Sequence, residues 1–136
     1  MTTIESKTVR VKNSSQEVFL FLKDMNNFYQ LLPQDKVSDF KSDTGQCSFR
    51  VQGAVVIPLV QVSVNEFSHI HIKSGDSAPF PFTLDINIHS LSEEECEGNL
   101  VFNGEMNAFL RMMAVGPLTN LFNYIANKLV EVKSLS

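Results

Sequence analysis

The spacing of hydrophobic residues changes along the chain, and this change separates a strand region from a helical one. From about position 35 to position 105, apolar and polar residues mostly alternate, which is typical of antiparallel strands with one buried face. Turn residues punctuate this region at short intervals, as at Asp43-Thr44-Gly45 and Gly53-Ala54. We predict a six-stranded antiparallel meander, with strands at Lys36–Lys41, Gln46–Gln52, Val55–Glu66, His69–Ser74, Phe82–Leu91 and Gly98–Glu105.

The C-terminal segment Ala108–Val132 has a helical period instead. Its apolar residues recur every three or four positions and fall on one stripe: Leu118, Leu121, Phe122, Ile125, Leu129 and Val132. A long amphipathic helix must cover an apolar wall, and the predicted sheet is the only one large enough. Gly116-Pro117 interrupts the pattern, which favours one helix with a kink. The alternative is a separate lid turn over Asn107–Val115.

The N-terminal part adds a strand and two short helices. Residues Thr3–Lys12 are rich in β-branched side chains and predict a first strand. Ser14 and Glu17 fit a capping box for a helix that follows, and a further helical turn over Asn26–Leu32 ends at Pro33. The order is therefore α+β, in one domain that spans residues 1–136.

The predicted strands have one apolar and one polar face. The apolar set is Cys47, Phe49, Val51, Ile70, Ile72, Phe82, Leu84, Ile86, Ile88, Leu100, Phe102 and Met106. Gly104 interrupts this row, which indicates a β-bulge or a bend where the sheet curls. Pro58 interrupts its strand, so we expect a β-bulge there as well.

The composition narrows the classes of function. The 136 residues are 43% hydrophobic and 19% charged, as in an ordinary globular protein. The net charge of -4 and the absence of a basic, aromatic-rich stretch argue against nucleic acid as a partner. No apolar run is long enough for a membrane span, and we expect no signal peptide. With only Cys47 and Cys96, free thiols and a cytoplasmic location are favoured over a disulfide.

The sequence resembles a known superfamily in three places. These are Val9-Arg10-Val11 with Asn13-Ser14-Ser15-Gln16-Glu17-Val18-Phe19, then Leu31-Leu32-Pro33, then the long final helix. In this order they are similar to the START-like superfamily, also called SRPBCC. Its members include polyketide cyclases and a family of carbon monoxide dehydrogenase subunits. Two further stretches, Cys47-Ser48-Phe49-Arg50-Val51 and Pro79-Phe80-Pro81-Phe82-Thr83-Leu84, resemble a bacterial branch of uncharacterised members.

The resemblance implies a helix-grip fold, in which a curved sheet wraps around the last helix and leaves an apolar cavity between them. The residues that we expect to line it come from the helical pair, the sheet and the final helix; many of them would also fill an ordinary core. They are Phe28, Leu32, Phe49, Phe82, Leu84, Ile86, Phe102, Met106, Phe109, Met113, Leu118, Phe122 and Ile125.

Catalytic chemistry has weak support in the sequence. A nucleophile with a partner base is missing, and the inward-facing set holds almost no polar residue. Thr8, Arg10, Gln61 and Ser63 stay possible exceptions, because the faces of their strands are uncertain. Glu105, Asn107 and Arg111 are expected at the cavity mouth, as head-group contacts or as a solvated rim.

The three histidines all fall on the polar face. His69, His71 and His89 could meet Asp85 across adjacent strands and form a surface metal site, but their spacing matches no dedicated motif. We therefore expect neither a metal nor a cofactor.

These observations favour a binding or transport protein for a small apolar molecule, such as a lipid, isoprenoid or polyketide. An enzyme of the cyclase, dehydrase or aromatase kind is the alternative, and a protein-interaction module is a third.

Overall fold

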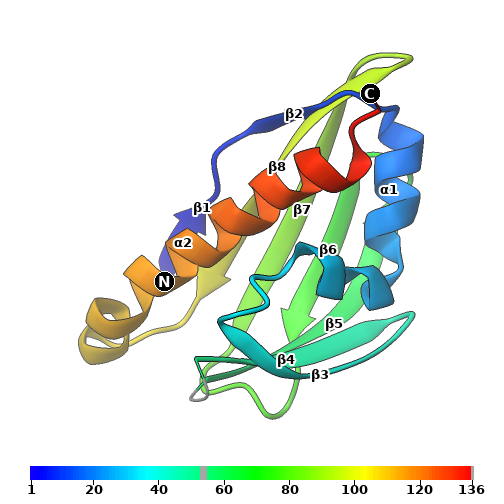
Figure 1. Cartoon of the computed structure of the whole chain (residues 1–136). Helices are drawn as coiled ribbons and strands as arrows, with labels where there is room; N and C mark the ends of the chain where they lie inside the picture. The colour runs from blue at the N-terminus through cyan, green and yellow to red at the C-terminus, as the bar shows by residue number, and fades with distance from the viewer. Residues whose placement is uncertain (53–54, 136) are drawn as a thin grey trace.

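The structure is a computed structural model that describes residues 1–52 and 55–135, and it has the predicted α+β order. Helix α2 crosses one face of a curved antiparallel sheet, with α1 and the 3₁₀ helix η1 beside it (Figure 1). The predicted turn at Gly53-Ala54 lies outside the described residues. The elements are β1 (Thr2–Glu5), β2 (Val9–Val11), α1 (Ser15–Lys23), η1 (Met25–Leu31), β3 (Val37–Asp43), β4 (Gln46–Val51), β5 (Val55–Asn65), β6 (His69–Ser74), β7 (Phe82–Ser92), β8 (Glu95–Gly104) and α2 (Ala108–Lys133).

The sheet is a meander from β3 to β8, and the N-terminal strands β1 and β2 pair with β8 along one edge of it. Among the described residues the strand order is β1-β8-β7-β6-β5-β4-β3, and β2 also pairs with β8. The six predicted strands of the meander are all present, within three residues at each end.

The predicted strand Thr3–Lys12 is wrong in one respect, because it is two strands, β1 and β2, that share the edge beside β8. Glu5 pairs with Val101 and Val9 pairs with Gly98, so the N-terminal segment holds one residue more than β8 between these pairs. Ser6 occupies the break: its N–H donates to Leu100 O, and its Oγ accepts from Leu100 N–H, both at 2.9 Å. The hydroxyl of Ser6 thus takes the place of a backbone carbonyl in the pairing with β8. The hydrophobic pattern of the sequence does not reveal such a substitution.

The β-bulge predicted at Pro58 is also wrong. Pro58 sits in regular register opposite Ser48, and the irregularity in β5 falls later, between Gln61 and Ser63. The carbonyl of Pro58 accepts from Gly75 N–H, one residue beyond the last β5–β6 pair. In a strand, the backbone nitrogen and the carbonyl of one residue point toward the same neighbouring strand. The nitrogen of Pro58, which carries no hydrogen, therefore faces the β6 side just beyond the last β5–β6 pair, where the proline interrupts no strand pairing.

Gly104 has a steric role and no bulge. It pairs regularly with Phe82 on one side and with Thr2 on the other. A Cβ at this position would lie 2.8 Å from the Phe102 ring and 3.1 Å from the Phe80 ring. Glycine is therefore needed because two aromatic rings cover the backbone.

The alternation of faces is confirmed. Ile70 and Ile72 on β6 are 0% exposed, whereas His69, His71 and Lys73 between and beside them reach solvent. The apolar residues of β4, β7 and β8 join the same core, together with the buried face of α2. The helices therefore cover only one face of the sheet, as the pattern predicts.

Helix α2 is one continuous helix from Ala108 to Lys133 and includes Pro117, so residues 108–116 form no separate lid turn. Asn107 caps it by accepting a hydrogen bond from Leu110 N–H at 2.8 Å. No helix in the described part of the chain is both long enough and apolar enough to span a membrane.

Candidate functional site

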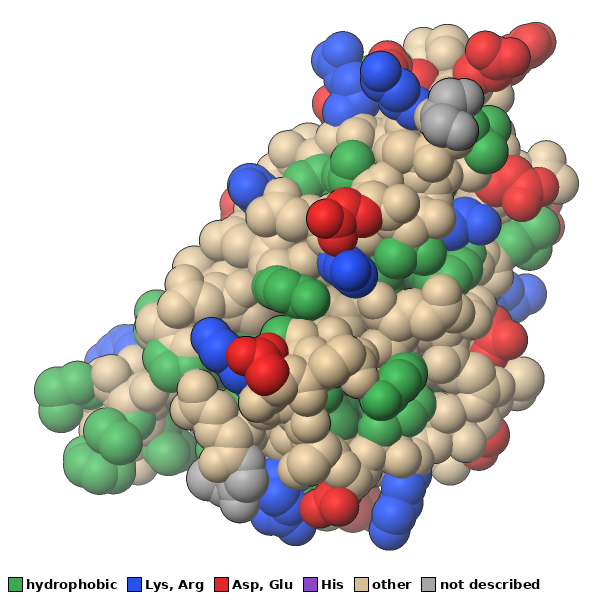
Figure 2. Space-filling model, in the orientation of Figure 1, with side chains coloured by type: hydrophobic (Ala, Val, Ile, Leu, Met, Phe, Trp, Pro, Cys, Tyr) green, Lys and Arg blue, Asp and Glu red, His purple; other side chains and the backbone are tan. Residues whose placement is uncertain are grey.

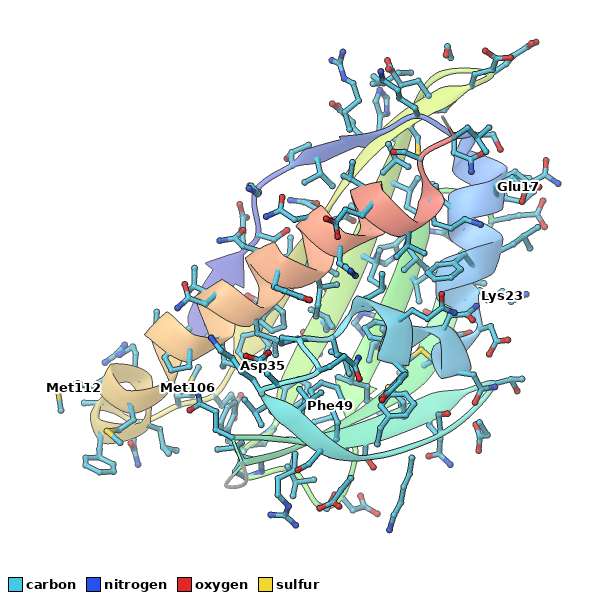
Figure 3. All side chains as sticks on the ribbon, in the orientation of Figure 1. Glu17, Lys23, Asp35, Phe49, Met106 and Met112 are labelled. Atoms are coloured by element: carbon cyan, nitrogen blue, oxygen red, sulfur yellow. The ribbon has the colours of Figure 1, made fainter. Side chains whose placement is uncertain are left out.

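The space between the sheet and α2 is nearly filled. Among the described residues we find two small cavities there, which we call the α1 cavity and the central cavity. Their volumes are about 30 Å³ and 10 Å³. Pockets that hold drug-sized ligands measure roughly 300–1,000 Å³, so the ligand-sized cavity that we expected is not open in this structure. Phe49 illustrates the reason: its ring points into the space beneath η1 and α2 (Figure 3).

The central cavity collects most of the residues predicted to line a binding site. It lies under the middle of α2, and its wall is made of apolar side chains from β4, β5, β7, β8, η1 and α2. The lining residues are Phe28, Phe49, Ile57, Leu59, Phe82, Leu84, Phe102, Leu118, Leu121, Phe122 and Ile125. Eight of the thirteen predicted residues are therefore brought together here.

Three of the lining residues, Ile57, Leu59 and Leu121, are missing from the predicted set. The first two flank Pro58, where the faces of β5 were uncertain. Leu121 belongs to the predicted helical stripe, so the stripe itself was the signal that could have found it.

An aromatic cluster forms the floor of the central cavity. The ring of Phe102 packs against Phe82 at 5.2 Å and against Phe122 of α2 at 5.4 Å between centroids. Phe80 meets Phe102 edge to face at 6.2 Å. Contacts of this kind add about 0.5–1.5 kcal/mol each to the burial of the rings, so they hold α2 against β7 and β8.

The α1 cavity lies closer to α1 and the C-terminal half of α2. Val18 and Leu22 of α1, Cys96 of β8 and Leu129 of α2 contribute to its wall. Ile86, another predicted residue, lines this cavity, and Phe28 and Ile125 line both. These two side chains therefore form part of the boundary between the cavities.

The remaining predicted residues do not line either cavity. Leu32 is buried elsewhere in the core, and Met106 packs against the core's edge. Phe109 and Met113 are 65% and 61% exposed, because they belong to the first turns of α2. These turns extend past the helices and strands that cover the rest of α2 (Figure 1).

A notch on the surface lies directly outside the central cavity. It has a volume of about 160 Å³ and is bounded by Pro33 before β3, Val51 of β4, and Pro117 and Tyr124 of α2. Leu121 lines both the notch and the central cavity. The side chain of Leu121 therefore lies between the notch and the central cavity.

The buried titratable groups of the interior are unsuited to catalysis. Burial raises the pKa of the Cys47 thiol to about 12. Burial, followed by the negative charge of Glu95, also raises the pKa of Cys96. Both thiols are free, and at neutral pH both stay protonated, so neither is an activated nucleophile.

The polar candidates of the sequence lie outside the cavities. Thr8 and Ser63 are exposed, and Arg10 makes a surface ion pair with Glu95 at 3.8 Å. Gln61 donates from Nε2 to Lys23 O at 2.8 Å, which ties β5 to the end of α1. The rim residues Glu105, Asn107 and Arg111 are exposed and line neither the cavities nor the notch.

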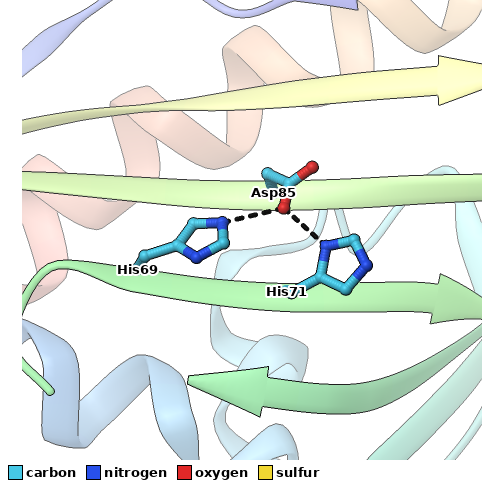
Figure 4. Close-up of side chains that lie close together, drawn as sticks. All are labelled: His69, His71 and Asp85. Atoms are coloured by element: carbon cyan, nitrogen blue, oxygen red, sulfur yellow. Dashed lines mark hydrogen bonds and ion pairs between the residues drawn. The ribbon is translucent and has the colours of Figure 1, made fainter. Parts of the chain in front are cut away.

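The histidines of β6 do meet Asp85. His69 Nε2 and His71 Nδ1 lie 2.8 Å and 2.6 Å from the same oxygen of Asp85 on β7 (Figure 4). His89 lies farther along β7, opposite Glu97, and does not take part.

Comparison with known proteins gives no match by sequence and many by structure. No family model matches the chain, and no curated protein is significantly similar to it. A START superfamily protein from Mycobacterium smegmatis superposes with a TM-score of 0.71 and 14% identity, over 96% of each chain. Norcoclaurine synthase from Thalictrum flavum, in complex with dopamine and hydroxybenzaldehyde, gives a TM-score of 0.66 and 13% identity, over 98% of this chain and 89% of that one.

An aromatase/cyclase is also similar. The di-domain protein BexL of the BE-7585A biosynthetic pathway matches with a TM-score of 0.66 and 9% identity, over 95% of this chain and 46% of its own. At such identities the likeness concerns the fold alone. The chain therefore has the START-like, helix-grip fold, which also includes polyketide cyclase-like proteins.

Proposed function

We propose that the protein binds a small apolar molecule between the sheet and α2, and that the molecule enters through the notch at Leu121. The observation that carries this proposal is the position of Leu121, which belongs to the walls of both the notch and the central cavity. The walls of that cavity are apolar throughout, so burial of apolar ligand surface drives binding. The START-like fold and the small-molecule complex of norcoclaurine synthase support this class of function.

Binding requires side chains to move. The two cavities together offer far less volume than a lipid or polyketide occupies, so a ligand must displace Leu121 and separate the N-terminal half of α2 from the sheet. That half is the less tightly held part of the helix. Between Ala108 and Pro117 no residue is buried, whereas Leu118, Leu121 and Phe122 are.

A test uses an apolar fluorescent probe, N-phenyl-1-naphthylamine, whose emission rises in an apolar site. We expect saturable binding to the wild type and an uptake rate several-fold higher for Leu121→Ala, because this change opens the notch to the central cavity. Val132→Ala is the matched control: Val132 is half-buried on the same helix and lines neither the cavities nor the notch.

Circular dichroism establishes that each variant is folded. If folded wild type and folded Leu121→Ala both fail to bind the probe, the proposal is rejected. Equal uptake by Leu121→Ala and Val132→Ala would reject the entry route. Native mass spectrometry of the freshly purified wild type then identifies a co-purified apolar molecule.

An enzyme of the cyclase or aromatase kind is less well supported. Such chemistry needs a proton-transferring group next to the substrate, and the described residues of the central cavity supply only hydrocarbon side chains. BexL shows that the fold accompanies an aromatase/cyclase in another protein, but among residues 1–52 and 55–135 no polar side chain lines the central cavity here.

A further inference from the structure

A cluster of three potential metal ligands lies on the sheet face opposite to α2. In β6, Ile70 and Ile72 are fully buried against the helices, so the intervening His71 and the preceding His69 project from the other face. Asp85 joins them from β7, where its backbone is directly paired with that of His71. The cluster is therefore separated from the interior cavities by the sheet itself.

The three side chains converge on one point. The carboxylate oxygen Oδ1 of Asp85 lies 2.8 Å from His69 Nε2 and 2.6 Å from His71 Nδ1 (Figure 4). One ligand atom from each residue can be chosen so that all three lie within 4.8 Å of one another. The side chains are 30%, 34% and 22% exposed for His69, His71 and Asp85, so the cluster is partly sheltered and still accessible from solvent.

The charge state of Asp85 suits a metal ligand. Burial alone would raise the pKa of Asp85, but the hydrogen bonds from His71 and His69 and their charges outweigh it and lower the pKa below its usual value. Asp85 is therefore a carboxylate at neutral pH. A neutral imidazole nitrogen and a carboxylate oxygen are both ordinary ligands of zinc.

We propose that His69, His71 and Asp85 bind a divalent transition-metal ion of the zinc type. Two imidazoles and one carboxylate form a three-ligand set that leaves a fourth position for water or a small anion. In each neutral ring, the proton on the nitrogen that faces Asp85 passes through solvent to the other ring nitrogen. The nitrogen that faces the ion then has a free lone pair, and no net proton is released. No change of oxidation state is involved.

Only small side-chain movements are needed. Zinc bonds to nitrogen and oxygen of about 2.0–2.1 Å in tetrahedral geometry separate the ligand atoms by about 3.3 Å. The two short contacts to Asp85 must therefore lengthen by about half an ångström, and the two ring nitrogens must approach each other. Rotations about the side-chain bonds achieve this, while the backbones of β6 and β7 stay paired. Because both strands lie inside the sheet, the site has a rigid support.

The paired backbones also show which groups surround the site. Ser63 of β5 is paired with His71, and Asn87 of β7 is paired with His69. Both are polar, uncharged residues on the same face, suited to hydrogen-bond a metal-bound water. The nearest cation along β6 is Lys73, one step farther along the same face.

The test uses isothermal titration of zinc chloride into metal-free protein without a histidine tag. We expect one zinc ion per chain for the wild type. The variants His69→Ala, His71→Ala and Asp85→Asn should each weaken binding roughly 100-fold or more, because each removes a direct ligand. His89→Ala is the control, since His89 is an exposed histidine of β7 outside the cluster, and it should bind as the wild type does.

A thermal melt separates a metal site from a purely structural pairing of the two strands. Zinc at about 100 times its Kd should raise the Tm of the wild type by roughly 10 °C and that of His71→Ala far less. Asp85→Asn keeps an oxygen that can accept from both rings, so a structural pairing would survive it, while zinc binding would not.

The proposal is overturned if the folded wild type binds no zinc. It is also overturned if His71→Ala and Asp85→Asn retain stoichiometric binding, or if His89→Ala loses binding to the same degree as they do.

Discussion

The two halves of α2 contain similar numbers of apolar residues but use them differently. In the C-terminal half, Leu121, Phe122, Ile125 and Leu129 are buried against the sheet and the other helices. In the N-terminal half, Phe109, Met112 and Met113 are 65%, 76% and 61% exposed. Figure 2 shows hydrophobic side chains gathered at the end of the molecule where these first turns lie, and Met112 points away from the sheet in Figure 3.

The hydrogen bonds that fasten α2 follow the same division. Asn13 Nδ2 donates to Lys133 O at 2.8 Å, Lys7 N–H donates to Asn123 Oδ1 at 2.8 Å, and Leu135 N–H donates to Lys12 O at 2.9 Å. Among the described residues, these bonds to the N-terminal segment all fall at or after Asn123. These bonds therefore fasten the second half of α2 to the N-terminal segment, whereas the first half is held by the packing of partly buried side chains such as Leu110 and Val115. Leu121, beside the notch, lies near the boundary.

The largest expected effect is that of a charge in the fastened half. Phe122→Asp removes the ring that packs on Phe102 and places a carboxylate against apolar side chains with no partner. We expect a loss of more than about 4 kcal/mol, which is a large part of the roughly 5–15 kcal/mol that stabilises a typical domain. Circular dichroism measures this. Asn127→Asp, on the exposed side of the same helix, is the control, and a wild-type melt for Phe122→Asp would refute the assignment of the buried face.

A matched pair of truncations compares the two halves directly. Leu121→Ala should reduce the free energy of unfolding by about 2–4 kcal/mol, because it deletes buried methyl groups and enlarges the central cavity. Met113→Ala should change it by less than about 0.5 kcal/mol, because that side chain is exposed. Urea denaturation of both variants gives the difference. Equal losses would mean that the two halves are held alike.

A smaller loss of stability is expected from Asn13→Ala, which removes a hydrogen bond to the C-terminal end of α2. Asn13 is 6% exposed and bonds through Nδ2 to Lys133 O and through Oδ1 to Ser14 N–H. Asn13→Ala should cost about 1–3 kcal/mol because it leaves buried polar groups unpaired. Asn127→Ala, an exposed change on α2, is its control in the same denaturation experiment. An unchanged stability for Asn13→Ala would show that the fastening contributes little.

The smallest effect is expected at the exposed first turns. The triple variant with Phe109→Ser, Met112→Ser and Met113→Ser should keep the wild-type stability within about 1 kcal/mol, since none of these side chains is buried. The same variant tests the third function, protein interaction, by light scattering after gel filtration. A wild type that forms oligomers which the variant abolishes would favour that function; a monomer in both cases counts against it.

The sequence predicted the elements well because their periods are local. Alternation placed Ile70 and Ile72 inside and His69 and His71 outside, and the helical stripe identified the buried side of α2. It failed at Ser6, where the outcome depends on a side-chain hydrogen bond to Leu100, and at Pro58, where it depends on the end of the β5–β6 pairing. It also failed at Gly104, where the ring of Phe80, from outside β8, covers the backbone together with that of Phe102. Such long-range contacts leave no periodic trace.

The site was only partly predictable for a related reason. The inward direction of Phe49, Phe102 and Phe122 follows from pattern, but the volume that they leave depends on how side chains from six elements interlock. Phe109 and Met113 are apolar like the buried residues of α2, so the sequence does not distinguish them. Only the position of the helix over the sheet shows that the sheet does not cover these two residues. The cluster around Asp85 required the pairing of β6 with β7 to bring its members within bonding distance.

The most direct test of apolar binding in the interior is an NMR titration with N-phenyl-1-naphthylamine, observed at the labelled methyl groups of isoleucine and methionine. Ile57 and Ile125 line the central cavity, while Met112 and Met113 report on the exposed turns of α2. We expect saturable shifts at both isoleucines, with intermolecular contacts between their methyl groups and the probe. Shifts confined to the two methionines, or none at any of the four residues, would contradict binding between the sheet and α2.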